Sequence, residues 1–155
     1  MKLAVLLKLK TRMKVSSYLV ERDVISSLTK QTLVELTNED YSATEIDNSV
    51  IETVIKSQSE MVDGYLRGRY DVPLPEVPTM IKDITLDLVK YALYKRRPES
   101  KMPETIESDR KFAIKQLEDI RDSKIHLGIE KDDTLQDEPS NWRVRSPEKV
   151  DITGY

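Results

Sequence analysis

The chain has 155 residues, 34% of them charged and 38% hydrophobic, with four glycines and a formal net charge of -3. This length predicts one domain, and the charged, glycine-poor composition favours an all-α protein over a β-sandwich. The chain has no cysteine and one histidine, His126, which excludes thiol nucleophiles, thiolate metal sites and any site that needs two imidazoles. The negative charge argues against a domain that binds nucleic acid through bulk electrostatic attraction.

Residues 1–16 form a basic N-terminal extension around a short apolar run, which starts at Leu3 and is interrupted by Lys8 and Lys10. The run is shorter than the core of a signal peptide and far shorter than the ~20 residues that span a bilayer. We therefore expect a protein made in the cytoplasm and without a membrane partner. Met13 is an alternative start, so residues 1–12 are either part of the native protein or an artefact of start choice.

Residues 17–128 carry the helical pattern. Two short helices are expected within 17–36, followed by a polar break at 38–42. Two overlapping capping boxes, Ser42 to Glu45 and Thr44 to Asp47, then predict a helix from about residue 45 to 67. Its apolar residues form two neighbouring stripes at helical spacing: Val50, Val54, Met61 and Tyr65, and Ile51, Ile55, Val62 and Leu66.

Residues 68–78 contain three prolines within six positions, at Pro73, Pro75 and Pro78. Proline disfavours helix and restricts the residue before it, so this segment is predicted to be a stiff, extended strap. Thr79 is expected to cap the next helix, which should run to about residue 96.

The helix at 79–96 is apolar on two sides. One stripe contains Ile81, Ile84 and Leu88, and the other contains Leu86, Val89 and Leu93. We expect the helix to be central, with the second stripe covered by another element or by another subunit. The residues of the second stripe are therefore candidates for partner binding.

The last long helix is expected over about 103–126, opened by Pro103 and closed by Gly128 as the residue after its end. His126 then lies in its last turn, where it suits a capping role. Phe112, the single phenylalanine, falls off the narrow apolar stripe of this helix and is a further candidate for partner binding.

Residues 129–155 form a C-terminal arm with an acidic run and no helical period. The only tryptophan stands in this polar arm, and Trp142, Arg143, Val144 and Arg145 alternate apolar with basic as a strand does. This pattern favours docking onto another chain, with a disordered tail as the alternative.

Two clusters offer sites for chemistry, each with a plainer interpretation. Asp83 and Asp87 lie one helical turn apart, as metal or acid-base carboxylates can, but Lys90 completes an ordinary ion-paired strip. Arg67 and Arg69, together with Arg96 and Arg97, are suited to a phosphate backbone, but cations are also common at helix ends.

A run of residues between the two central helices resembles a known family. Tyr65-Leu66-Arg67-Gly68-Arg69-Tyr70-Asp71-Val72-Pro73-Leu74 is followed by Val77-Pro78, by Asp87-Leu88 to Tyr91-Ala92-Leu93-Tyr94 and by Arg96-Arg97. This order and spacing is similar to the Mu-like prophage family of head-to-tail connector, adaptor or head-completion proteins of tailed phages. The likeness extends over roughly 18–128, and departs from the family at Val20, where a Thr or Ser cap is usual.

The resemblance implies a structural virion protein that forms an oligomeric ring between portal and tail. Its partners would be the portal protein, a further neck or tail protein and copies of itself, with DNA passing only as cargo. Arg69 and Tyr70, at the centre of the motif, join the partner-binding candidates. The protein would assemble in the host cytoplasm and lie in the virion neck.

We therefore expect an all-α bundle of four to five helices with an extended C-terminal arm, and neither catalysis, cofactor nor metal. The alternative from another class is a helical nucleic-acid-binding regulatory protein that uses the arginine cluster. A carboxylate-metal enzyme centred on Asp83 and Asp87 is a second alternative.

Overall fold

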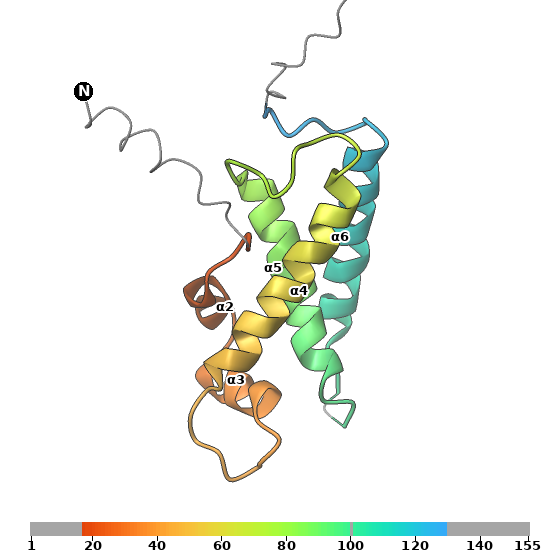
Figure 1. The fold of residues 1–155 in the computed structure, drawn as a ribbon. Helices are drawn as coiled ribbons and strands as arrows, with labels where there is room; N and C mark the ends of the chain where they lie inside the picture. The colour runs from red at the N-terminus through yellow and green to blue at the C-terminus, as the bar shows by residue number, and fades with distance from the viewer. Residues whose placement is uncertain (1–16, 100, 130–155) are drawn as a thin grey trace, which may run out of the picture.

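The computed structural model describes residues 17–99 and 101–129, and this part of the chain is all-α (Figure 1). Its helices are α2 (Glu21–Ser27), α3 (Lys30–Thr37), α4 (Asn48–Leu66), α5 (Thr79–Lys95) and α6 (Glu104–Arg121). The three long helices pack side by side, and the two short ones lie against one half of this bundle (Figure 1). The predicted fold class is confirmed, while the C-terminal arm beyond Ile129 lies outside the described residues.

Two clusters of buried side chains divide the interior along the bundle. The first lies between the three long helices and the strap, with Tyr18, Val62, Leu66, Tyr70, Leu74, Ile81, Ile84, Leu88, Ala113, Leu117 and Ile120. The second lies between α2, α3, the start of α4 and the end of α5, with Leu19, Val24, Leu33, Leu36, Ile51, Ile55, Val89 and Leu93. Helices α4 and α5 contribute to both clusters and so form the common support of the fold.

Helix α5 is central, as its two apolar stripes predict. Leu88 is 2% exposed in the first cluster, and Val89, the next residue along the helix, is fully buried in the second. No helix in the described ranges is long and apolar enough to cross a membrane.

Helix α4 begins three residues later than predicted. Asp47 is its N-cap and accepts a hydrogen bond from the backbone N–H of Ser49 at 3.0 Å. This bond lowers the pKa of Asp47, together with the hydroxyl of Ser49, which is the larger cause. The predicted capping boxes at Ser42 and Thr44 do not open the helix, because the carboxylate nearest the apolar run takes that role.

Contrary to the prediction, the strap is not extended throughout: the backbone N–H groups of Arg69 and Tyr70 both donate to the carbonyl oxygen of Leu66 at 2.9 Å, which forms a turn, and bends follow at 72–73 and 75–76. The strap is anchored at its middle, where Leu74 is 1% exposed. The backbone N–H of Leu74 donates to the hydroxyl of Tyr18 at 3.3 Å, and that hydroxyl donates to the carboxylate of Asp63 on α4. At the end of the strap, Pro78 occupies the N-cap position, so Thr79 is the first helical residue and not the cap. The strap therefore joins α4 to α5 and is held to the bundle at Leu74.

Helix α6 is shorter than predicted. It begins after Pro103 as expected but ends at Arg121, and Ser123 takes a φ of 67° just beyond it. The backbone N–H groups of Lys124 and Ile125 both donate to the carbonyl oxygen of Asp119, at 2.8 and 3.2 Å. Gly128 has a φ of 72°, but it turns the chain seven residues after the helix and does not close the helix. His126 consequently lies outside the last turn of α6.

At the start of the described chain, Val20 takes the N-cap position of α2. Its side chain offers no acceptor, and the carboxylate of Asp23 accepts the backbone N–H of Val20 at 3.2 Å instead. The departure from the family pattern at Val20 therefore leaves the helix start in place. Residues 1–16, the predicted basic extension, lie outside the described part of the chain.

Candidate functional site

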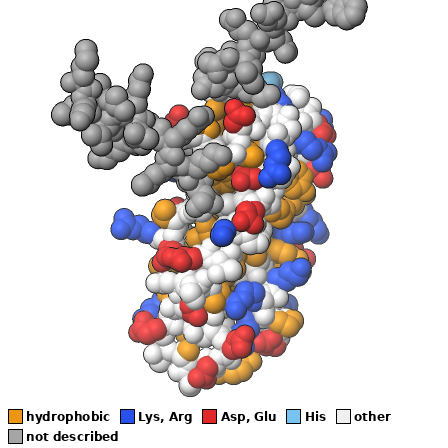
Figure 2. All heavy atoms as spheres, in the orientation of Figure 1, with side chains coloured by type: hydrophobic (Ala, Val, Ile, Leu, Met, Phe, Trp, Pro, Cys, Tyr) orange, Lys and Arg blue, Asp and Glu red, His pale blue; other side chains and the backbone are white. Residues whose placement is uncertain are grey.

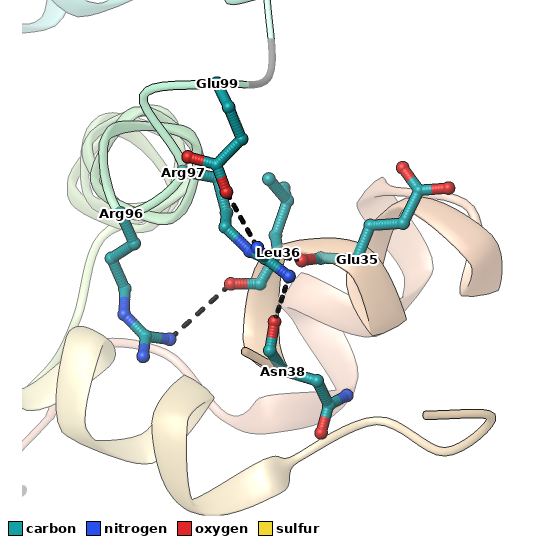
Figure 3. Close-up of polar contacts among 6 residues, drawn as sticks. All are labelled: Glu35, Leu36, Asn38, Arg96, Arg97 and Glu99. Atoms are coloured by element: carbon teal, nitrogen blue, oxygen red, sulfur yellow. Dashed lines mark hydrogen bonds and ion pairs between the residues drawn. The ribbon is translucent and has the colours of Figure 1, made fainter. Parts of the chain in front are cut away.

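Two consecutive arginines at the end of α5 hold the end of α3 (Figure 3). Arg97 donates from Nε to the carbonyl oxygen of Glu35 at 3.1 Å and from Nη2 to the carbonyl oxygen of Asn38. Arg96 donates from Nη1 to the carbonyl oxygen of Leu36 at 3.5 Å. The last carbonyl groups of a helix lack partners within it and carry partial negative charge, which suits a guanidinium. The end of α3 is therefore capped by side chains of α5.

The charge of Arg97 is matched locally. Its Nη1 forms an ion pair with Glu99 at 2.7 Å, and its guanidinium carbon lies 4.8 Å from the centroid of the Tyr41 ring. The side chain of Arg97 is only 12% exposed, whereas Tyr41 is 83% exposed. Arg97 thus stabilises the packing of α3 against α5, whereas the ring of Tyr41, which lies over its guanidinium, is exposed.

A cavity of about 300 Å³ opens beside this contact. It is lined by Val34, Glu35, Asp40, Tyr41, Ala43 and Arg97. The pKa of Asp40 is lowered, because its carboxylate accepts the backbone N–H of Ser42 at 2.8 Å and the hydroxyl of Ser42 at 2.7 Å, so Asp40 is ionised at neutral pH. Within the described residues, neither Glu35 nor Asp40 forms an ion pair with Lys or Arg. The cavity combines apolar walls with an excess of negative charge.

Sequence patterns alone do not predict this cavity. Arg96 and Arg97 were expected to be cations at the end of their own helix or phosphate ligands, because the partners of Arg97 lie 59 and 62 residues earlier in the chain. One signal was present: α3 ends at Thr37 and Asn38 with no glycine to close it. Carbonyl groups left open in this way need a donor from elsewhere.

Arg69 and Tyr70 hold the segment after α6, at the opposite end of the bundle. Arg69 donates to the carbonyl oxygen of Ile120 and, at 3.2 Å, to that of Ile125. Its Nη2 lies 3.2 Å from Nδ1 of His126. The hydroxyl of Tyr70 accepts the backbone N–H of Leu127 at 3.1 Å, and Tyr70 is only 8% exposed. The expectation that Tyr70 contacts a partner is therefore wrong, and the guanidinium of Arg69 is occupied within the chain.

The four arginines of the predicted cluster do not gather. Arg67 and Arg69 follow α4 near the strap, whereas Arg96 and Arg97 follow α5 at the end that carries α3 (Figure 1). Figure 2 shows acidic and basic side chains interspersed over the face that it draws, without a continuous basic surface. The structure thus separates the residues on which the nucleic-acid interpretation depends.

The second stripe of α5 is covered from within the chain. Val89 and Leu93 are fully buried among residues of α2, α3 and α4, and Leu86 packs against the same cluster. The expectation that Val89 and Leu93 contact a partner is therefore wrong. The second stripe was expected to be covered either by another element of the chain or by another subunit. The structure shows the first, because α2 and α3 cover it.

Phe112 is 62% exposed on α6, as its position off the apolar stripe indicates. It remains a candidate for partner binding. Trp142, Arg143, Val144 and Arg145, the other candidates, lie outside the described residues.

The carboxylates of α5 are arranged as an ion-paired strip. The Nζ atom of Lys90 lies 3.3 Å from Oδ1 of Asp87. Burial raises the pKa of Asp87, Lys90 opposes this, and the carboxylates of Asp109 and Asp83 add to the rise. In the described ranges no group of three or more His, Cys, Asp or Glu residues is placed to hold a metal ion.

Comparison with known proteins finds similarity to proteins of bacteriophage Mu and of a Mu-like prophage. The model of the family described as Bacteriophage Mu, Gp36 matches residues 18–146. The chain is 27% identical to Gene product J of Escherichia phage Mu over 114 residues, which are 74% of this chain and 78% of that protein. It is 29% identical to the Mu-like prophage FluMu protein gp36 of Haemophilus influenzae over 108 residues, 70% of this chain and 74% of that protein.

Proposed function

Because the chain belongs to the bacteriophage Mu Gp36 family, we propose that it is a structural virion protein that forms an oligomeric ring between the portal and the tail, as a head-to-tail connector or adaptor. Its partners are the portal protein, a further neck or tail protein and copies of itself, and DNA passes through the ring as cargo. The protein assembles in the host cytoplasm and lies in the virion neck. This role needs no catalysis, cofactor or metal.

The observation that carries the proposal is the extent of the family match, which includes the whole described bundle and continues through Trp142 to residue 146. The bundle supports it in a second way, because both of its ends are fixed. The strap is tied to Tyr18 and Asp63 at one end, and α3 is tied to Arg97 at the other. Rigid ends allow identical subunits to repeat the same contact, which closed rings require.

Phe112 is the described residue that we expect in the contact between subunits. A single exposed apolar residue is common on monomers, but aromatic residues are enriched in interfaces. Phe112→Ala should weaken ring formation, whereas Lys111→Ala, at a neighbouring site that is also exposed on α6, should not.

The direct test is native mass spectrometry of the full chain, alone and mixed with the portal protein of the same genome. We expect a multimer of one defined copy number, either alone or on the portal. A chain that stays monomeric under both conditions contradicts the proposal. Cryo-electron microscopy of the virion neck then gives the number of copies.

The alternative is a helical nucleic-acid-binding regulator. It predicts binding to duplex DNA with an affinity that falls steeply as salt rises, because each neutralised phosphate releases counterions. We expect no such binding, since the arginines lie at two ends of the bundle. Tight, salt-dependent binding to a short duplex would replace the connector proposal.

A further inference from the structure

We infer that the cavity beside Arg97 receives the Trp142–Arg145 segment of a neighbouring copy of this chain. The inference rests on the proposed ring and adds to it a specific contact between subunits. The cavity has apolar walls, an aromatic ring at its edge and negatively charged residues in its lining.

The size of the cavity suits one large side chain. Its volume of about 300 Å³ lies at the lower end of the ~300–1,000 Å³ that small-molecule sites occupy. An indole is the largest single side chain that the protein can offer, and Trp142 is the only tryptophan in the chain. Val34 and Ala43 provide apolar walls, and the exposed ring of Tyr41 provides a surface for stacking.

The charges of the two surfaces are complementary. Glu35 and Asp40 line the cavity, and Glu99 already balances the charge of Arg97. The segment presents Arg143 and Arg145 next to Trp142. When Trp142 enters the cavity, the long side chains of its neighbours can reach carboxylates at the rim, which adds charge-assisted hydrogen bonds to the apolar contact.

The position of the cavity suits a contact between copies. The described part of the chain ends against the first cluster, which includes strap residues, whereas α3 and the loop after it lie at the other end of the bundle (Figure 1). A contact between a segment from one end and a cavity at the other is heterologous, and heterologous contacts that repeat by rotation close into rings. The twelve residues from Glu130 to Asn141 span up to roughly 40 Å, enough to reach an adjacent subunit.

The first experiment maps the contact in the otherwise unchanged full chain. Trp142 is replaced by a photoreactive phenylalanine analogue, and copies labelled with heavy nitrogen are mixed with unlabelled copies before assembly and illumination. We expect crosslinks from position 142 to residues 34–43, joining labelled to unlabelled chains. Crosslinks within one chain, or between chains but elsewhere on the bundle, overturn the inference.

The second experiment tests the cavity with matched variants. Ala43→Leu fills the cavity, whereas Thr44→Leu adds the same apolar bulk to the adjacent residue, which does not line it. Ala43→Leu and Trp142→Ala should each weaken self-association by roughly 10- to 30-fold, as the loss of an aromatic anchor does. The two changes together should weaken it no further than either alone, because they remove one contact. Effects that multiply, or an equal loss with Thr44→Leu, contradict the inference.

Intrinsic fluorescence separates failure of the inference from failure of the proposed function. The emission of Trp142 should shift to shorter wavelength and become resistant to quencher when the wild-type chain assembles, and Ala43→Leu should abolish this change. A ring that forms while Trp142 stays open to quencher rejects the docking and leaves the connector proposal intact. The basic, apolar residues 1–16 are the rival occupant of the cavity, and their docking leaves Trp142 emission unchanged.

Discussion

The guanidinium of Arg97 donates to the carbonyl oxygen of Glu35 at 3.1 Å, across 62 residues of sequence, and so fastens the last turn of α3 to the end of α5. Arg97→Ala removes this bond, the bond to Asn38 and the ion pair with Glu99. We expect a lower urea midpoint for Arg97→Ala and only partial recovery for Arg97→Lys, since an ammonium cannot reproduce the planar fork. Arg67→Ala, at an exposed site after α4, serves as the control and should leave the midpoint unchanged.

The hydroxyl of Tyr18 should make the free energy of unfolding decrease at alkaline pH. Burial raises the pKa of Tyr18, and the bond to Asp63 raises it further. The folded chain therefore keeps this proton above the pH near 10.0 at which the unfolded chain loses it, so the free energy of unfolding falls as pH rises beyond that value.

Tyr18→Phe tests this prediction. The variant should lose about 1 kcal/mol at pH 7 through its missing hydrogen bonds, and its free energy of unfolding should fall less steeply above pH 10. Tyr91→Phe, whose ring stacks with Arg110, is the control and should follow the wild type. Urea titrations between pH 7 and 11 measure both effects, and parallel curves for Tyr18→Phe and wild type would contradict the assignment.

Leu88 tests the central position of α5. It is 2% exposed between the three long helices, so Leu88→Ala should cost ~2–5 kcal/mol through lost transfer energy and a residual cavity. Phe112→Ala, at a site 62% exposed, should change the free energy of unfolding by no more than ~0.5 kcal/mol. Equal losses for the two variants in chemical unfolding would show that the packing of α5 is not as described.

Pro78 tests how the strap stabilises the fold. Its φ of -61° suits alanine, and its carbonyl oxygen accepts the N–H groups of Ile81 and Lys82, at 3.0 and 3.2 Å, in either case. Pro78→Ala should therefore cost ~0.4–1 kcal/mol because the unfolded chain gains freedom, and Pro78→Gly should cost more. Glu76→Ala, an exposed strap residue, is the control for side-chain loss. An unchanged midpoint for both Pro78 variants would make the strap a passive linker.

The sequence predicted the elements whose boundaries are set by local chemistry. Pro78 and Pro103 act on their own backbone, so the starts of α5 and α6 could be placed within about a residue. The end of α6 could not, because it depends on Ser123 adopting a positive φ and on Arg69 reaching Ile120 from the segment after α4. Gly128 was predicted to end α6, but the helix ends at Arg121.

The candidate site was harder to predict than the fold, because its contacts join residues far apart in sequence. Arg97 contacts α3, and Tyr18 donates a hydrogen bond to Asp63, only in the packed fold. The apolar residues of α5 were identified correctly, but periodicity cannot tell whether a second apolar face is covered by the same chain or by another. Val89 and Leu93 were therefore assigned to a partner when two short helices of the chain itself cover them.

The contacts of Arg69 and Tyr70 fix more than the end of α6. Through Ile125 and Leu127 they hold the last described residues against the bundle and so set the point at which the described part of the chain ends. In a ring of identical subunits such points lie on a circle with equal angular spacing. The number of C-terminal segments and their spacing around the axis then follow from the symmetry of the ring and from two side chains after α4, whatever the length of the segment itself.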